Sequence, residues 1–252
     1  MPIRMDILVI GESCLDRFIY GSCTRVAPEA PALVFNQSSM STNPGMAMNT
    51  KKNIDALVDT DCSIFTNDNW KDITKTRYVD ERTNQMFLRV DKGDDLVDKC
   101  DVNVLFDDYP TADAVIVSDY CKGFLTEKDI ERIAAHYPYT FMDTKKTLGF
   151  WCDNVDYIKV NEHEYVMTKH AVDDHLATKI IITRGKDGCE HLGKRYPVPF
   201  VDMKDCAGAG DTFLAALVVK FSIDLDIVEA IEYGNACATD VIQKRGVSYV
   251  GQ

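Results

Sequence analysis

The amino-acid sequence predicts an α/β fold with a mainly parallel central sheet flanked by helices. Short, continuous apolar runs recur along the chain, as in strands that helices cover on both faces. Segments with helical periodicity lie between these runs, so that strands and helices alternate as they do in βαβ units. The chain has 252 residues, 46% of them hydrophobic, and we expect a single domain over residues 1–252.

The strands are expected at the apolar runs, and each run ends at a polar residue or a glycine. The first run covers residues 7–10 and ends at Gly11. The others cover residues 114–117, 140–142, 157–160 and 180–182. They end at Ser118 and Asp119, at Asp143, at Asn161 and at Thr183. Ligands of such folds bind beyond the carboxyl ends of the strands, so these polar residues should gather at the functional edge.

Helices are expected between the strands and at the end of the chain. The helical patterns cover residues 47–57, 126–136, about 209–222 and 227–244. Thr126 with Asp129, and Asp226 with Glu229, resemble the paired residues of a capping box. These pairs therefore indicate where two of the helices begin.

Two stretches, residues 17–36 and 75–91, do not fit this alternation and read as short β segments. A small β lid over one edge of the central sheet would accommodate both. Apolar residues of these stretches that would need cover are Phe18, Val34, Phe35 and Phe87. We therefore expect a homodimer formed through the lid.

Composition excludes several classes of function. The formal net charge of −12 would repel a nucleic-acid backbone, and no run of basic residues counteracts it. An anionic substrate would need a local pocket of Arg, Lys and N–H groups. No apolar run approaches the roughly 18 residues of a membrane span. The nine cysteines are scattered without a C-x-x-C pair and no signal peptide is evident, so a cytoplasmic location with reduced thiols is expected.

The strongest local signal is the string D-C-A-G-A-G-D-T-F at residues 205–213, which an apolar helix follows at once. Gly208 and Gly210 let the backbone approach a ligand, and the N–H groups from Ala209 onward form an anion site suited to phosphate. Asp211 beside a phosphate would serve to take a proton from an incoming hydroxyl, and the helix start should help to keep it ionised. Alternatively, the glycines form a tight turn and Asp211 only caps the helix.

This string resembles the second signature of the PfkB or ribokinase-like kinases, D-x-x-G-A-G-D-x-F. Further family features are Gly11 and Asp16 after the first strand, the N-x-x-E motif from Asn161 to Glu164, and Thr183, Gly185 and Gly188 before the signature. The resemblance implies a ribokinase-like carbohydrate kinase that uses ATP and Mg²⁺. It also implies that Asp211 is the catalytic base and that Gly208, Ala209 and Gly210 form the anion hole.

The resemblance implies roles for residues outside the signature. Asp16, assisted by Asn49, would hold sugar hydroxyls. Asn161 and Glu164 would order magnesium and its waters near the ATP phosphates. The alternative is that Asn161 simply caps a helix and Glu164 is solvated.

Basic side chains are candidates for binding a phosphate of the substrate, because Arg engages phosphate oxygens in a bidentate way. They are Arg25, Arg77, Arg89, Lys122 and Lys145. Asp119 is a further candidate for the sugar. On the nucleotide side the candidates are Lys145, Asn161, Glu164, Thr183, Gly185 and Asn235. For Asn235, plain packing of the last helix is the alternative.

A narrower resemblance lies in the strings L-D-R-F-I-Y-G at residues 15–21, R-V-A-P-E-A-P at residues 25–31 and S-D-Y-C-K-G at residues 118–123. These are similar to the heptose 7-phosphate kinases, which phosphorylate the anomeric hydroxyl in lipopolysaccharide heptose synthesis. Two residues depart from that subfamily: Met46 replaces the second glycine of P-G-G-A, and Thr144 replaces the proline of D-P-K.

Only 15 residues separate Val58 from Asp72 when both ends are counted, where the family usually carries another strand and helix. One edge of the sheet is therefore expected to be trimmed. Two alternatives stay open beside the heptose kinase: another PfkB-type carbohydrate or nucleoside kinase, and a non-catalytic sugar-phosphate or nucleotide sensor. A nucleotidyltransferase domain is not expected, because the sequence has no H-x-G-H motif.

Overall fold

The computed structural model describes residues 5–59, 61–244 and 246–251. Its central sheet contains β1 (Asp6–Ile10), β4 (Asp61–Phe65), β7 (Ala114–Asp119), β8 (Thr140–Thr144), β9 (Tyr157–Asn161), β10 (Ile180–Thr183), β11 (Cys189–His191) and β12 (Lys194–Tyr196). The strand order is β12-β11-β10-β9-β8-β7-β1-β4. All neighbours from β10 to β4 are parallel, and β11 and β12 add an antiparallel hairpin. The predicted, mainly parallel sheet is confirmed.

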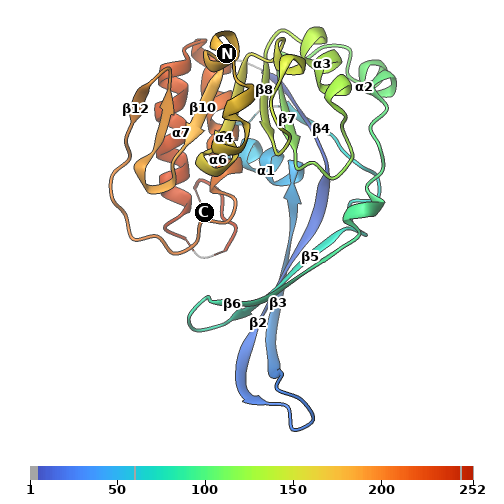
Figure 1. Ribbon diagram of the computed structural model, residues 1–252, viewed down its shortest axis with the longest axis vertical. Coiled ribbons are helices and arrows are strands. Elements are labelled where there is room, and N and C mark those ends of the chain that lie inside the picture. The colour runs from blue at the N-terminus through green and yellow to red at the C-terminus, as the bar shows by residue number, and fades with distance from the viewer. Residues whose placement is uncertain (1–4, 60, 245, 252) are drawn as a thin grey trace.

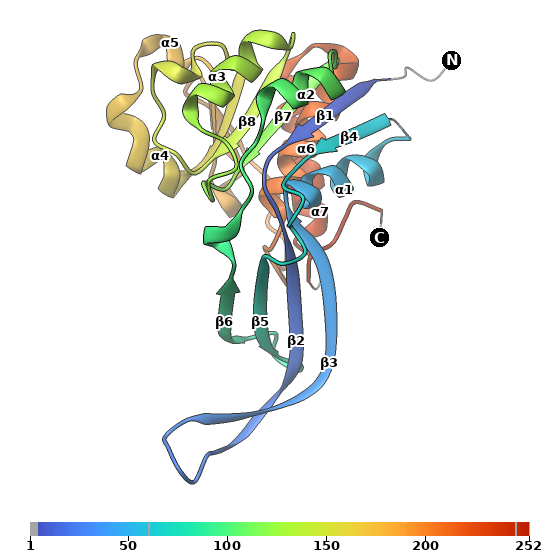
Figure 2. The same ribbon diagram turned by 90° about the vertical axis from the view of Figure 1, so that its right-hand side faces the viewer.

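A second, four-stranded sheet extends away from the body of the molecule (Figure 1). It contains β2 (Ser13–Val26), β3 (Leu33–Met46), β5 (Thr74–Asp80) and β6 (Met86–Lys92), in the order β3-β2-β5-β6. We call it the outer sheet. Figure 2 shows that β2 and β3 form a long hairpin that reaches well beyond β5 and β6. Both stretches expected to form β segments do so, but the strands are longer than expected. Strand β2 begins at Ser13, shortly after β1 ends, and β3 continues to Met46, directly before the next helix.

Helices cover both faces of the central sheet (Figure 2). One face carries α1 (Ala47–Leu57), α6 (Ala209–Asp224) and α7 (Ile227–Val241), and the other carries α2 (Val102–Asp108), α3 (Glu127–His136), α4 (Glu162–Thr168) and α5 (Asp174–Ala177). Short 3₁₀ turns lie at Asp94–Leu96, Phe150–Cys152, Lys169–Ala171 and Gly185–Asp187. No helix in these described ranges is long and apolar enough to cross a membrane.

The hydrophobic core has two halves, one on each face of the sheet. Successive side chains of a strand point to opposite faces, so Leu8 and Ile10 of β1 join the cluster that includes Ile130 of α3. Ile7 joins the cluster that includes Leu217 of α6. All of these side chains are at most 1% exposed. Burial on both faces is the physical reason why the strand reads as a continuous apolar run.

The predicted helix starts are confirmed, with one difference at α7. Thr126 and Asp129 form a complete capping box at α3. Asp226 accepts hydrogen bonds from the N–H groups of Val228 and Glu229, but the Glu229 carboxylate lies 3.9 Å from the ammonium group of Lys220. Helix α7 also ends at Val241, earlier than the expected 244. The short helices α2, α4 and α5 and the β11–β12 hairpin were not predicted, because each is too short for a clear periodicity.

The segment between Val58 and Asp72 contains β4, which is the edge strand of the central sheet beside β1. The described residues 66–73 that lead from β4 to β5 contain no helix. The sheet therefore ends at β4: the short segment supplies a strand, which the prediction of a trimmed edge did not include, but no helix among these described residues.

Candidate active site

A cavity of about 360 Å³ lies where the first turn of α6 meets α1, the segment after β7 and the outer sheet. We call it the central cavity. Predicted site residues that line it are Asp16, Asn49, Arg77, Arg89, Lys122, Lys145, Gly208 and Asp211. The fold thus brings together residues separated by up to almost the full length of the chain.

Asp211 is held in a fixed orientation in this cavity. Its Oδ2 accepts a hydrogen bond from Nδ2 of Asn49 at 2.6 Å, and its Oδ1 accepts one from the hydroxyl of Tyr120 at 2.8 Å. The side chain is buried, and burial raises the pKa of Asp211 above its ordinary value, although the hydrogen bond from Asn49 opposes the rise. A carboxylate that is oriented and more basic than usual suits a proton acceptor.

The start of α6 forms the predicted anion site. Gly208 precedes the helix with a φ of 82°, a left-handed conformation that glycine adopts without strain. The first N–H groups of a helix have no partner within it, so they are available to an anion. A side chain at Gly210 would begin 2.9 Å from Nζ of Lys159, so glycine here lets that ammonium group approach the helix start. The backbone dipoles of the helix and the buried ammonium group of Lys159 therefore both favour an anion at the start of α6.

A chain of charged side chains follows the carboxyl ends of β8 and β9. Lys159 donates to Oδ2 of Asp143 at 2.6 Å, and Lys145 lies 3.1 Å from Oδ1 of Asp143. Burial alone would raise the pKa of Asp143, but Lys159 and Lys145 bring it below its ordinary value. Lys145 also donates to Oε1 of Glu164 at 2.5 Å. The network links the start of α6 to the N-x-x-E motif.

The two N-x-x-E residues form a capping box at the start of α4. Oδ1 of Asn161 accepts from the N–H of Glu164, and Oε2 of Glu164 accepts from the N–H of Asn161, both at 2.8 Å. Asn161 thus caps the helix, as in the alternative interpretation, but Glu164 is paired with Lys145. The carboxylate and amide oxygens are of the kind that magnesium prefers, and a magnesium ion bound through water molecules fits them. Their role in metal binding stays a prediction.

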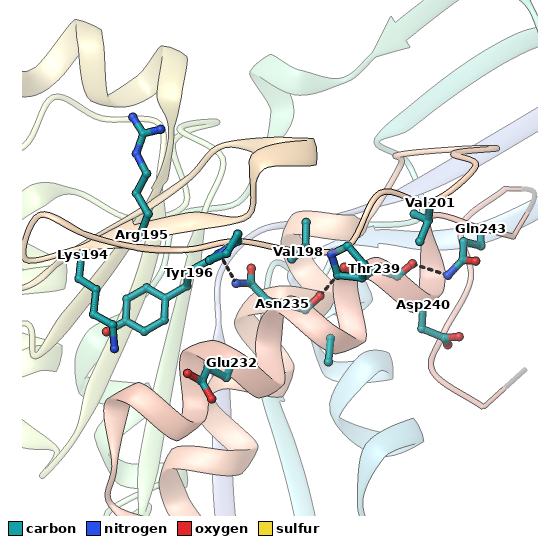
Figure 3. Close-up of a pocket in the computed structure, with 13 residues that line it drawn as sticks. Lys194, Arg195, Tyr196, Val198, Val201, Glu232, Asn235, Thr239, Asp240 and Gln243 are labelled. Carbon is teal, nitrogen blue, oxygen red and sulfur yellow. Dashed lines mark hydrogen bonds between the residues drawn. The ribbon is translucent and has the colours of Figure 1, made fainter.

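A second cavity, of about 600 Å³, lies between α7 and the chain that follows β12 (Figure 3). Tyr196, Val198 and Val201 contribute apolar walls. Asn235 lines this cavity, and its amide donates to the carbonyl of Tyr196 at 2.9 Å. The side chain therefore ties α7 to β12, and it stands beside a pocket of the size and character of a small-molecule site.

Several predicted site residues line neither cavity. Ala209, Gly210, Asn161 and Glu164 lie in the first turns of α6 and α4 described above, and four others lie elsewhere. Arg25 is exposed toward the far end of the outer sheet. Thr183 and Gly185 lie at and just beyond the carboxyl end of β10, and neither lines either of the two cavities described above. Asp119 is fully buried behind the central cavity, where it accepts from Lys146 at 2.7 Å and from Thr144. Its position is that of a support for the segment after β7 and not of a direct sugar ligand.

The structure adds three side chains that the sequence patterns did not indicate: Lys75, Tyr120 and Lys159. Lys75 is buried on β5 and lines the central cavity. Lys159 interrupts an otherwise apolar strand, and a charge inside such a run needs a buried partner. That interruption was the available signal. Tyr120 belongs to the S-D-Y-C-K-G string at residues 118–123, but that string gave no role for its side chain.

Basic side chains gather at the central cavity although the chain as a whole is negative. Five basic side chains line it (Lys75, Arg77, Arg89, Lys122 and Lys145) against two acidic ones (Asp16 and Asp211). Each of these basic side chains is paired with a carboxylate. Arg77 pairs with Asp16, Arg89 with Asp91, Lys75 and Lys122 with Asp94, and Lys145 with Asp143 and Glu164. An anionic substrate would therefore compete with these carboxylates for the basic groups.

Comparison with known proteins gives concordant results. Residues 53–250 match the sequence model described as pfkB family carbohydrate kinase. The chain is 27% identical over 296 residues to the bifunctional protein HldE of Marinomonas sp. (strain MWYL1), covering 97% of this chain and 62% of that protein. It is 28% identical over 299 residues to HldE of Hyphomonas neptunium, covering 97% and 61%. The chain thus spans about three fifths of the length of these relatives.

Solved structures share the fold. A ribokinase from Thermotoga maritima superposes with a TM-score of 0.72 at 18% identity, covering 96% of this chain and 94% of that one. Phosphofructokinase-2 from Escherichia coli, in complex with potassium, gives a TM-score of 0.71 at 12% identity, covering 96% and 94%. The ribokinase-like fold expected from the signature is confirmed.

Proposed function

The chain belongs to the pfkB family of carbohydrate kinases, and on that premise we propose that it transfers the γ-phosphoryl group of ATP to the anomeric hydroxyl of a heptose 7-phosphate. The observation that carries the proposal is a juxtaposition. The buried carboxylate of Asp211, the N–H groups at the start of α6 and a cavity lined by five basic side chains lie together. A proton acceptor, an anion site and a pocket for an anionic acceptor are what this transfer requires.

Two features support a sugar phosphate as the acceptor. The basic side chains that line the central cavity suit a substrate that carries its own phosphate, which would replace Asp16 and Asp91 as the partner of Arg77 and Arg89. Asn49 lines the same cavity, and its Oδ1 is buried with no hydrogen-bond partner among the described residues. A sugar hydroxyl would satisfy that acceptor, since a buried polar atom left unpaired is costly.

The nucleotide would bind with its base in the second cavity and its phosphates extending toward Asp211. The apolar walls of that cavity suit a planar base. Lys145 and Glu164, which are paired, follow β8 and β9, and these strands stand between β12 and β7 in the sheet order. Asn161 and Glu164 would hold magnesium through its waters, and the ion would offset charge on the phosphates.

The chemistry is a single displacement. The acceptor hydroxyl oxygen attacks the γ-phosphorus while its proton passes to the carboxylate of Asp211. The bond between the γ-phosphorus and the bridging oxygen breaks, and its electron pair leaves with ADP. The N–H groups at the start of α6 and the ammonium of Lys159 stabilise the negative charge on the transferred group.

The test is a panel of sugars and sugar phosphates assayed for ATP-dependent ADP release, with the product phosphate located by ³¹P NMR. We expect heptose 7-phosphate to be phosphorylated at the anomeric position with a higher kcat/KM than free heptose. Its KM should rise with salt, because screening weakens the attraction of the cavity for a phosphate.

Other results favour the alternatives. Equal kcat/KM on the free and phosphorylated heptose supports a general carbohydrate kinase, and turnover of a nucleoside alone supports a nucleoside kinase. Binding of ATP or a sugar phosphate without ADP release on any acceptor supports a non-catalytic sensor.

We also propose that two copies associate through the outer sheet. Met86, Leu88 and Val90 of β6 are 45–56% exposed. Leu88 and Val90 flank Arg89, which faces the central cavity, so these two share the opposite face of the strand, whereas a bulge breaks the alternation between Met86 and Leu88. Phe18, in contrast, is 5% exposed and lies beneath Arg77, so it needs no further cover. The apolar face for a partner is therefore that of β6.

A further inference from the structure

Tyr120 lies in the short segment that follows β7, and the reaction described above gives its side chain no role. Its hydroxyl donates a hydrogen bond to Oδ1 of Asp211 at 2.8 Å, and the residue lines the central cavity. Since Asn49 donates to Oδ2, each oxygen of the carboxylate is held by a donor from a different part of the fold. Each oxygen keeps a second lone pair for a donor in the cavity.

We propose that Tyr120 is a positioning residue for the phosphoryl transfer, which orients the Asp211 carboxylate toward the acceptor hydroxyl and stabilises its ionised form. The role rests on the proposed function, because it assigns a second residue to the same step. Asn49 fixes one oxygen only, and a carboxylate held at one oxygen can still rotate about its Cβ–Cγ bond. The second donor removes that freedom, which is the preorganisation a general base needs.

The backbone that carries Tyr120 is itself held by two buried carboxylates. The N–H of Cys121 donates to Oδ1 of Asp119 at 3.2 Å, and the N–H of Lys122 donates to Oε1 of Glu12 at 2.7 Å. Both acids are fully buried. Cys121 also has a left-handed backbone, with a φ of 58°, which a non-glycine residue adopts only when its surroundings impose it. The segment is therefore shaped to present the phenol to Asp211.

The phenol stays a donor throughout the reaction. Burial, with the negative charge of Asp211 next, raises the pKa of Tyr120 well above its ordinary value. Its ring packs against the cluster of Cys14, Met46 and Ile73, and Nζ of Lys145 lies 5.5 Å from its centroid. The proton of the acceptor hydroxyl therefore passes to Asp211, and Tyr120 keeps its own.

Other groups that act on Asp211 come from several elements. Besides Asn49 of α1, Asp143 of β8 raises the pKa of Asp211 and Lys159 of β9 lowers it. Tyr249 of the C-terminal segment is close enough for Asp211 to raise the pKa of its phenol. Burial and Asp143 thus favour protonation of Asp211, while the two hydrogen bonds and Lys159 oppose it. Removal of one hydrogen bond should shift the balance toward the protonated acid.

The test is Tyr120→Phe, which keeps the ring and removes the hydroxyl. The Asp211 carboxyl is titrated by ¹³C NMR in the parent and the variant, with Asp211→Asn to assign its signal. We expect the pKa of Asp211 to rise by about one unit, the usual effect of losing a hydrogen bond to a charged group. The acid limb of the pH–kcat profile should move upward by the same amount, so that kcat on that limb falls about tenfold.

Tyr137→Phe is the matched control. Its hydroxyl donates to the carbonyl of Tyr109 at 2.6 Å, away from the cavity, so the same chemical change should leave both the Asp211 titration and the pH profile as in the parent. A second variant carries 3-fluorotyrosine at position 120. The fluorinated side chain has nearly the same shape as tyrosine, but its hydroxyl is a stronger hydrogen-bond donor. It should therefore lower the pKa of Asp211.

An unchanged Asp211 titration in both variants at position 120 overturns the proposal. The titration needs no substrate, so it decides the role of Tyr120 even if no sugar is phosphorylated. If no sugar is phosphorylated, the proposed function is wrong, but the titration result for Tyr120 still stands. Should Tyr120→Phe not fold, the opposite shift expected of the fluorinated side chain still gives a decision.

Discussion

At Asp211, opposing effects act on one carboxylate: burial raises its pKa, and hydrogen bonds from Asn49 and Tyr120 lower it. The raised pKa makes the group a better proton acceptor but moves its protonation closer to neutral pH. The two hydrogen bonds limit the rise in the pKa of Asp211. Proton acceptance at neutral pH thus depends on the residues around Asp211 as well as on Asp211 itself.

We expect Asp211→Asn to lower kcat by roughly 10² to 10⁴, the usual contribution of a positioned general base. The affinity for ATP should be retained or improved, because a negative charge near the phosphates is removed. ADP release and ATP binding are measured for both proteins. Asp224→Asn, which removes a charge at the other end of α6, is the control and should keep parental turnover. Parental turnover in Asp211→Asn would falsify the role of Asp211 as base.

Met46 is a strained residue beside the same cavity. Its φ of 59° and ψ of −133° belong to a region that glycine enters easily and other residues do not. Its side chain is nevertheless buried and lines the central cavity. The residue therefore combines a backbone cost, of order 1–3 kcal/mol, with packing that opposes it.

Comparison of two variants separates these contributions. Met46→Ala loses the packing and keeps the strain, whereas Met46→Gly loses the packing and relieves the strain. We expect Met46→Gly to be more stable than Met46→Ala by about 1 kcal/mol or more in denaturant unfolding. Equal stability of the two variants would show that the backbone at this position is unstrained.

At the scale of elements, the first turn of α4 joins a helix cap to a charge network. Glu164 accepts from the backbone of Asn161 and from Lys145. A glutamine at this position can still accept from the backbone, but it cannot neutralise Lys145 or carry charge toward a metal ion. The substitution therefore tests the charge with little change in the cap.

In Glu164→Gln we expect the magnesium concentration for half-maximal turnover to rise several-fold, because one anionic partner of the hydrated ion is lost. Initial rates are measured over a magnesium titration at saturating ATP. Glu162→Gln is the matched control: it stands on the same turn, pairs with Arg184 and should titrate as the parent does. An identical magnesium dependence in Glu164→Gln and the parent contradicts the metal role.

At the scale of the whole molecule, the outer sheet supplies side chains to the central cavity and an apolar face to its surroundings. Lys75, Arg77 and Arg89 come from β5 and β6 and line the cavity. Leu88 and Val90 face the other way. Cover of that face by a second copy would also restrain the strands that carry the basic side chains.

We expect the parent to sediment as a dimer at micromolar concentration and Leu88→Lys to sediment as a monomer, because a charge would be buried in the interface. Leu192→Lys is the control, since Leu192 is also exposed but lies between β11 and β12. A parent that is monomeric with full activity removes the proposed dimer.

The sequence by itself determined the longer helices and five strands of the central sheet, because burial on two faces and helical periodicity leave patterns within a few residues. It also determined the family and singled out Asp211 as the candidate base, because glycines, a helix start and a carboxylate form one contiguous string. Tertiary structure decided the rest of the site. Tyr120 and Asn49 reach Asp211 from 91 and 162 positions away, so no local pattern connects them.

Burial was likewise decided only by packing. The helix start alone suggested a low pKa for Asp211, yet desolvation by the surrounding elements raises it. Asp119 looked like a site residue but is fully buried and paired with Lys146, while Arg25 lies far out on β2. Exposure and electrostatic environment depend on which distant segments cover a side chain, and these are properties that the order of residues along the chain does not contain.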